Sequence, residues 1–199
     1  MSTKPFHVGT KRQIATFLNP TRSDIYQRLA LFGPLSARQI AEAIELPVTA
    51  LYHHLKYLLR VGLVVAVEEP RVGKSSGRPA LVYDAIGRVV GLSTEIDKPG
   101  HGDLVSKAAR SAAVQASRDF KAAVGEPLSE FEGRLKNIGF FRTLFSPSPR
   151  KLARVNALLD ELRELTSTPD GKSGQLMTIA WFTSPVVRGR RKRRRSGRR

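Results

Sequence analysis

Apolar residues recur at intervals of three and four along five stretches of the chain, which is the period of helices with one buried face. These stretches are residues 19–32, 36–44, 48–61, 103–124 and 149–166. Two shorter runs, 63–68 and 80–84, are rich in apolar and β-branched residues and predict a pair of strands joined by a loop. The pattern therefore predicts a mainly α fold with a small β component.

Residues that favour helix ends fix the limits of the first three predicted helices. Asn19, Thr21 or Ser23 can accept a free backbone N–H group at the start of the first helix, and Pro20 suits its first position. Ser36 can accept such a group at the start of the second helix. Gly33 ends the first helix and Gly62 ends the third. The sequence thus predicts helix, helix, turn, helix and two-stranded wing in this order.

The third predicted helix has two different faces. Leu51, Leu55 and Leu58 share one face, which we expect to be buried. The DNA major groove is about 12 Å wide and admits a helix, whose first turns meet base edges while a basic loop meets phosphate or the minor groove. The residues predicted to contact DNA are Thr49, Ala50, Tyr52, His53 and Lys56 on the helix, and Arg71, Lys74 and Arg78 on the loop.

Four segments of this region resemble a known family. In chain order they are NPTR, LSARQIAEAIEL, HHLKYLLRVGLV and GRPALVY. Together they resemble the winged helix-turn-helix of ArsR-type bacterial transcriptional regulators over residues 19–86. The resemblance implies a homodimer that reads an inverted-repeat operator in double-stranded DNA with helix 48–61 and a basic wing, 70–79. The thiolate metal sites of some members are not implied, because the chain has no cysteine.

The chain is strongly basic, with a formal net charge of +17. Residues 187–199 hold nine Arg or Lys and no acid, so the rest of the chain carries only +8. Such a segment has almost no apolar surface to bury and is predicted to be disordered and to bind phosphate without sequence preference. The residues predicted to make these non-specific contacts are Arg190, Arg191, Lys192, Arg193, Arg194 and Arg195.

This charge leaves two alternatives to a sequence-reading regulator. The chain could be a non-specific RNA- or chromosome-associated basic protein, because its tail attracts any polyanion. The winged helix could also serve for protein–protein contact rather than for DNA binding.

Catalytic and metal-binding patterns have little support. The Gly-Lys-Ser sequence at 73–75 lacks the upstream glycine of a phosphate-binding loop, because Glu68 stands there. His53 and His54 are adjacent on a helix and point about 100° apart, so they are a poor chelating pair. We therefore predict no enzymatic activity, no metal and no cofactor.

The sequence contains neither a predicted membrane span nor a predicted secretion signal. No run of about 18 apolar residues is present, so no membrane span is expected. The N-terminus lacks an apolar signal core, so secretion is not expected. We expect a cytoplasmic, nucleoid-associated protein.

The sequence predicts five parts, of which we call the second the head. They are a flexible basic arm (1–18), a winged helix-turn-helix domain (19–88, the head), a linker (89–102), a helical and strand–helix–strand region for dimerisation or regulation (103–186), and the basic tail (187–199). Apolar runs at 140–146 and 175–183 predict the strands of the fourth part. Trp181 and Phe182 are expected in its strand core, with a ligand pocket as the alternative. An unidentified small-molecule effector would have to act through this part.

Overall fold

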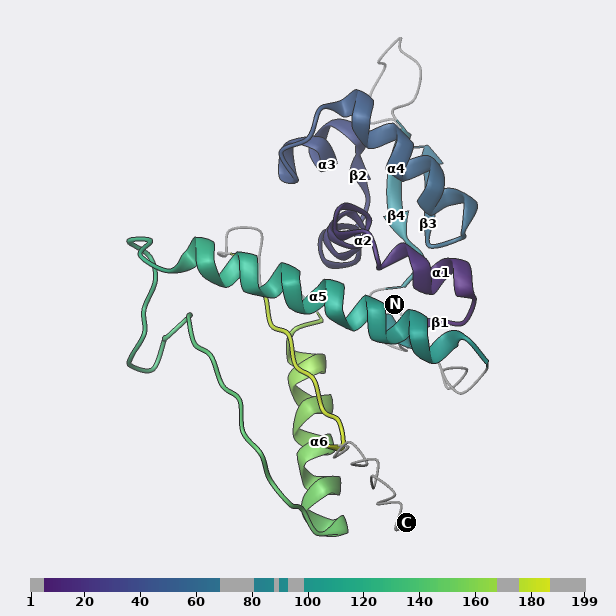
Figure 1. The fold of residues 1–199 in the computed structure, drawn as a ribbon. Coiled ribbons are helices and arrows are strands. Elements are labelled where there is room, and N and C mark those ends of the chain that lie inside the picture. Colours follow the sequence, from purple (N-terminus) through teal and green to yellow (C-terminus); the bar gives the residue numbers. More distant parts are fainter. Residues whose placement is uncertain (1–5, 69–80, 88–89, 93–98, 168–175, 187–199) are drawn as a thin grey trace, which may run out of the picture.

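The chain folds into a head of three helices and a small sheet, followed by two long helices (Figure 1). The computed structural model describes residues 6–68, 81–87, 90–92, 99–167 and 176–186. The predicted mainly α fold with a small β component is confirmed. The predicted helix, turn, helix and wing follow one another in the expected order.

The helices of the head begin and end where the sequence indicated. They are α2 (Pro20–Phe32), α3 (Ala37–Ala43) and α4 (Val48–Arg60). The Asn19 side chain accepts a hydrogen bond from the backbone N–H of Arg22 at 3.1 Å and starts α2. Ser36 and Gln39 form a reciprocal capping box that starts α3. These caps satisfy backbone donors that a helix start would otherwise leave unpaired.

A three-stranded antiparallel sheet closes the head. Its strands are β2 (Leu35–Ser36), β3 (Val64–Glu68) and β4 (Leu81–Ala85), with β4 in the centre. Val64 lies opposite Ala85 and Glu68 opposite Leu81, so β3 and β4 form the base of the wing. Leu35 pairs with Tyr83, which ties the segment before α3 to the same sheet.

One hydrophobic core joins all of these elements. Its largest fully buried side chains come from α2, α3, α4 and the start of β3: Ile25, Tyr26, Leu29, Ile40, Leu51, Leu55, Leu58, Leu63 and Val64. The Tyr26 hydroxyl donates to the carbonyl oxygen of Gly87 at 2.8 Å, so the buried ring keeps its polar end satisfied. The core therefore packs against only one face of α4, the face that carries Leu51, Leu55 and Leu58.

The N-terminal segment is packed on the head, which corrects the expectation of a flexible arm. Strand β1 (Phe6–Val8) pairs in parallel with β5 (Val90–Leu92), inside the segment expected to be a linker. Helix α1 (Lys11–Thr16) follows, and its Ile14 is buried in the core. The physical reason is that Val8 and Ile14 bury their apolar surface in the core, which holds the segment on the head.

Helix α5 (His101–Ala123) lies across α1 and α2 (Figure 1). Its first half packs on the core through Leu104 and Val105, and the Ser111 hydroxyl donates to the carbonyl oxygen of Leu18 at 3.3 Å. Its second half leaves Phe120 exposed. The helix predicted at 103–124 is confirmed, but only the N-terminal half of α5 is covered by the core within the described residues.

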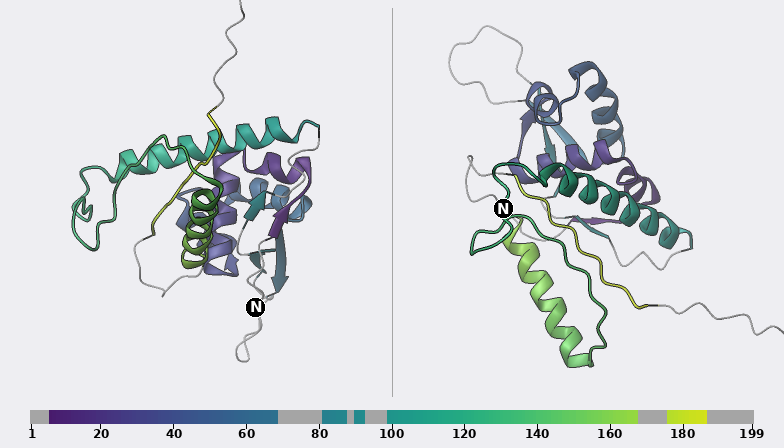
Figure 2. Two further views of the ribbon diagram at one scale, coloured as in Figure 1. Left: turned by 90° about the horizontal axis from the view of Figure 1, so that it is seen from below. Right: turned by 60° about the vertical axis from the view of Figure 1, so that its left-hand side comes forward.

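The C-terminal region contains one further helix, α6 (Pro149–Leu165), and none of its residues is buried. It projects from α5 on the side away from the head, as Figure 1 and the right-hand view of Figure 2 show. The strands predicted at 140–146 and 175–183 are wrong for the described residues: 140–146 and 176–183 pair with no strand. A strand is stable only with a hydrogen-bonded neighbour, and these apolar segments have none in the single chain.

Candidate nucleic-acid interface

Helix α4 presents one fixed face and one free face. Leu51, Leu55 and Leu58 are at most 1% exposed and hold the helix against the core. The five helix residues predicted to contact DNA all lie on the exposed side: Thr49, Ala50, Tyr52, His53 and Lys56. Tyr52 is 52% exposed although it follows the fully buried Leu51. The structure thus brings these five residues together on the surface of one rigid helix.

A tight turn sets α4 at an angle to α3. Glu45 has a left-handed backbone with φ of 55°, and the backbone N–H of Leu46 donates to the carbonyl oxygen of Ala41 at 3.0 Å. Pro47 then begins α4, whose backbone N–H at Leu51 donates to the carbonyl oxygen of Pro47 at 3.1 Å. This turn leaves the first residues of α4 at the surface, where a base edge can be approached.

The far end of α4 is closed by a glycine. Gly62 has φ of 70°, a conformation that favours glycine, and the backbone N–H of Leu63 donates to the carbonyl oxygen of Leu58 at 3.1 Å. The chain then enters β3 directly. The helix and the base of the wing are therefore joined without a flexible connection.

His54 differs from its neighbour His53 in its surroundings. His53 is exposed, whereas His54 is half-buried and its Nδ1 has no hydrogen-bond partner among the described atoms. Burial lowers the pKa of His54, and the nearby charges of Arg22 and His53 lower it further. His54 is therefore a neutral packing residue near neutral pH.

Arginines from two helices meet on Tyr57. The guanidinium of Arg22, from the first turn of α2, lies 3.7 Å from the centre of the Tyr57 ring, and that of Arg60 lies 5.1 Å from it. Arg12 of α1 lines the same hollow as Tyr57 and Arg60. Sequence reasoning did not assign these residues to the interface, because the three arginines are far apart in the chain.

The basic wing and the tail lie outside the described residues. This applies to Arg71, Lys74 and Arg78, and to the tail residues from Arg190 to Arg195. What the structure describes of the wing is its base, where Val65, Val67 and Leu81 are exposed. The wing and tail contacts with DNA stay predictions.

The predicted absence of a metal site stays untested, but the geometry of the two histidines is now known. The rings of His53 and His54 are 5.7 Å apart between centres, with 77° between their planes. Among the described residues, no three His, Cys, Asp or Glu side chains lie together as metal ligands would. In the same residues, none of the helices combines the length and the apolar character of a membrane span.

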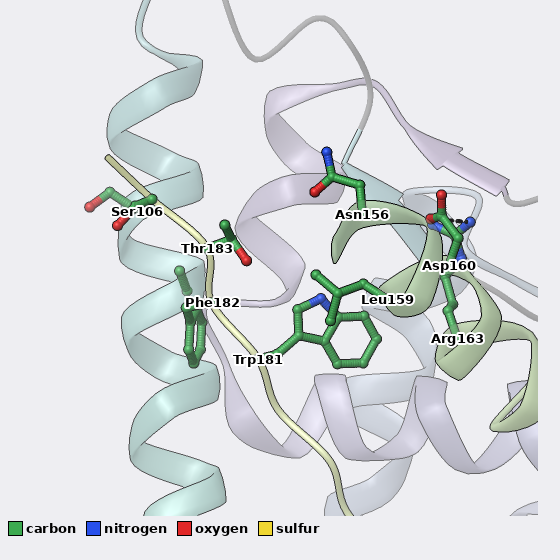
Figure 3. Close-up of a pocket in the computed structure, with 10 residues that line it drawn as sticks. Ser106, Asn156, Leu159, Asp160, Arg163, Trp181, Phe182 and Thr183 are labelled. Atoms are coloured by element: carbon green, nitrogen blue, oxygen red, sulfur yellow. Dashed lines mark ion pairs between the residues drawn. The ribbon is translucent and has the colours of Figure 1, made fainter. Parts of the chain in front are cut away.

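A second hollow, of about 830 Å³, lies between α5, α6 and the segment 181–184 (Figure 3). Trp181 and Phe182 line it from one side and Leu159 from α6. Arg163 and Asp160 form an ion pair at 3.0 Å in its wall. The wall therefore has an aromatic part and a charged part.

Comparisons with known proteins identify the class of the head. Residues 17–67 match the model of a family described as a helix-turn-helix domain. Residues 17–67 are thus a helix-turn-helix domain, in agreement with what the sequence predicted for the head. The match ends in β3, before the two long C-terminal helices.

The other two comparisons concern the whole chain. No curated protein matches it. Among solved structures, it is similar to the apo form of a double mutant of ZitR from Lactococcus lactis, with 13% sequence identity and a TM-score of 0.31. The similarity covers 77% of this chain and 86% of that one.

Proposed function

We propose that the protein regulates transcription as a homodimer that reads an inverted-repeat operator, with helix 48–61 in the major groove and the basic wing 70–79 on the flanking DNA. One observation carries this proposal: the predicted base-reading residues of α4 are exposed while its opposite face is buried in the core. Because the buried face of α4 packs on the core, its exposed side chains keep fixed positions from which they can contact base edges.

Each predicted contact has a chemical rationale. The methyl group of Thr49 and that of Ala50 suit the C5-methyl of thymine, and the hydroxyl and ring of Tyr52 offer a donor and an apolar face. His53 can donate or accept according to its protonation. Lys56 lies farther along the helix and suits a phosphate.

Support for the homodimer comes from the apolar surface of the C-terminal region. An isolated helix of the length of α6 is marginal in water, yet α6 buries none of its residues within the single chain. The large apolar side chains more than 40% exposed in this region are Val114, Val124, Leu128, Phe131, Leu135, Phe140, Phe141, Leu144, Phe145, Leu158, Leu165, Leu176, Met177, Ile179, Trp181, Phe182 and Val186. Pairing of two copies would remove this surface from water.

Dimerisation would also set the spacing of the two heads. A palindromic site places its half-sites about 34 Å apart, one turn of DNA, and a two-fold axis through the C-terminal regions would present two copies of α4. A small-molecule effector would enter the hollow of about 830 Å³ between α5, α6 and 181–184, from which it could alter this spacing.

Alanine substitution on the exposed face of α4 tests the DNA proposal. A variant with Tyr52→Ala and His53→Ala should lose selective binding to a duplex that the wild type prefers, while its unfolding temperature stays within a few degrees. The matched control is Arg154→Gln on α6, an exposed arginine remote from α4. Retention of selectivity by the double variant would favour the protein-contact alternative.

Sedimentation equilibrium tests the dimer separately. The single chain has a mass of 22.0 kDa, and we expect one species of twice this mass at micromolar concentration. Replacing Leu159 and Leu162 of α6 by Asp should shift the protein to the monomer, because both are half-buried on the apolar side of the helix. A wild-type monomer under these conditions would contradict the dimer.

A further inference from the structure

Three arginines surround one tyrosine at the C-terminal end of α4. The Arg22 guanidinium is stacked 3.7 Å above the Tyr57 ring, and Arg60 lies 5.1 Å from the ring centre on the same helix as the tyrosine. A hollow of about 280 Å³ opens here, lined by Arg12, Tyr57, Arg60 and Val61. The hollow is large enough for a phosphate group and is bordered by positive charge.

The positive charge at this place is not compensated within the part of the chain that the structure describes. The four ion pairs described there involve other basic residues: Arg28, Arg38, Lys107 and Arg163. The Nε of Arg22 is buried and has no hydrogen-bond partner among the described atoms.

Hydrogen bonds hold the cluster together from three segments. The Gln13 side chain forms a capping box with Thr10 and donates through Nε2 to the carbonyl oxygen of Val61 at 3.1 Å. This contact docks α1 on the end of α4 and brings Arg12 next to Arg60. The Asn19 cap fixes Arg22 in the first turn of α2. The cluster is therefore a product of the fold rather than of mobile side chains alone.

The cluster continues the exposed stripe of α4. Thr49, His53, Lys56 and Arg60 follow at intervals of four, three and four, which places them on one side of the helix. Eleven residues at 1.5 Å each separate Thr49 from Arg60 by about 17 Å, whereas the major groove is about 12 Å wide. If α4 enters the groove by its start, its end therefore lies at the edge of the groove, near the sugar–phosphate backbone.

We propose that Arg12, Arg22 and Arg60 form, around the ring of Tyr57, a binding site for one phosphate group of the DNA backbone at the edge of the major groove. The inference rests on the proposed function, since it assumes that α4 faces duplex DNA. It adds a fixed phosphate contact in the head itself, independent of the wing and of the tail. Arg22, stacked on Tyr57, orients the site, and Arg12 and Arg60 supply most of the accessible donors.

A neighbouring group offers an independent readout. Arg22 is one of the charges that lower the pKa of His54, after the effect of burial and ahead of the charge of His53. A phosphate bound at Arg22 neutralises part of this charge, so the pKa of His54 should rise on DNA binding. The imidazole proton resonances of His54 report this change by NMR.

The test measures the salt dependence of duplex binding by full-length chains. Each neutralised phosphate contributes about 0.9 to the slope of log affinity against log salt. Arg12→Gln with Arg60→Gln should reduce the slope by about 0.9, so that the loss of affinity between 50 and 200 mM salt becomes about 3.5-fold smaller. Arg12→Lys with Arg60→Lys should keep the slope, and the control Arg154→Gln should leave it unchanged.

The outcomes separate this inference from the proposed function. Suppose that the wild type binds duplex DNA, that the Gln variant has the same slope of log affinity against log salt, and that both proteins are folded by circular dichroism. This result would contradict the phosphate site but not the proposed regulator. Failure of the wild type to bind any duplex would overturn both. In a parallel experiment, 10 mM inorganic phosphate replaces DNA. If the pKa of His54 rises with phosphate while the Gln variant keeps the wild-type salt slope on DNA, the site binds a free anion and the contact with the DNA backbone is contradicted.

Discussion

Two adjacent residues of α4 have opposite environments, and exchanging each for alanine separates folding from recognition. Leu51 is fully buried and Tyr52 is 52% exposed. Leu51→Ala removes three carbon groups from the core, worth about 2.4 kcal/mol at about 0.8 kcal/mol each. The cavity that remains raises the loss in free energy of unfolding to about 3–4 kcal/mol.

This loss should be visible as a large change in melting temperature. In a domain the size of the head, each 1 kcal/mol shifts the midpoint by about 4–8 °C, so Leu51→Ala should lower it by at least about 12 °C. Tyr52→Ala removes an exposed ring and should change stability by about 0.5 kcal/mol or less. It should nevertheless reduce the preference for a selected duplex over a random one about tenfold, equivalent to about 1.4 kcal/mol.

Circular dichroism melts and fluorescence anisotropy titrations measure the two effects. The wild type and both variants are compared at one salt concentration, because affinity for DNA depends steeply on salt. Equal melting temperatures for Leu51→Ala and the wild type would refute the assignment of α4 to the core. Undiminished duplex selectivity in Tyr52→Ala would refute the assignment of its outer face to base reading.

Three further predictions concern single interactions in the head. Ser36→Ala removes the acceptor of the α3 capping box and should lower the free energy of unfolding in urea by about 1 kcal/mol, so an unchanged midpoint would contradict the role of the cap. Tyr26→Phe deletes the 2.8 Å hydrogen bond to the carbonyl oxygen of Gly87 and should also cost about 1 kcal/mol, measured in the same way. His54 has a lowered pKa in the folded protein, so the unfolded chain binds the proton more readily; its contribution to stability is present above pH of about 6.5 and is lost as the pH falls below that value. Melting temperatures from pH 8 to 5 should therefore fall less steeply in His54→Gln than in the wild type, and identical profiles would argue against a buried neutral His54.

The head could be predicted from sequence because local signals and burial agree there. The caps at Asn19 and Ser36, the stop at Gly62 and the three-leucine face of α4 each act within one or two turns of chain. Their spacing therefore carries the information directly. The exposed positions of α4 followed from the same periodicity.

The N-terminal and C-terminal parts were harder to predict for two different reasons. Strand β1 pairs with β5 more than eighty residues later, a contact that short-range periodicity does not encode. The runs at 140–146 and 175–183 have the composition of strands, but composition does not supply a pairing partner. Their exposed apolar side chains instead define the surface that the proposed dimer would cover.

The arginine cluster illustrates the same limit for the candidate site. Arg12, Arg22 and Arg60 lie on three different helices, and only the docking of α1 on the end of α4 brings them together. In the sequence each is one of 34 basic residues and carries no signal of its own.

The central claim is that α4, and not the basic tail, selects the DNA sequence. The most direct measurement is selection of bound duplexes from a random pool at about 150 mM salt, with the full chain and with a chain that lacks residues 188–199. We expect both proteins to recover the same inverted repeat, the shortened chain with weaker overall affinity and a smaller salt slope. The claim would be contradicted if neither protein recovers a motif, or if the chain without residues 188–199 no longer binds DNA.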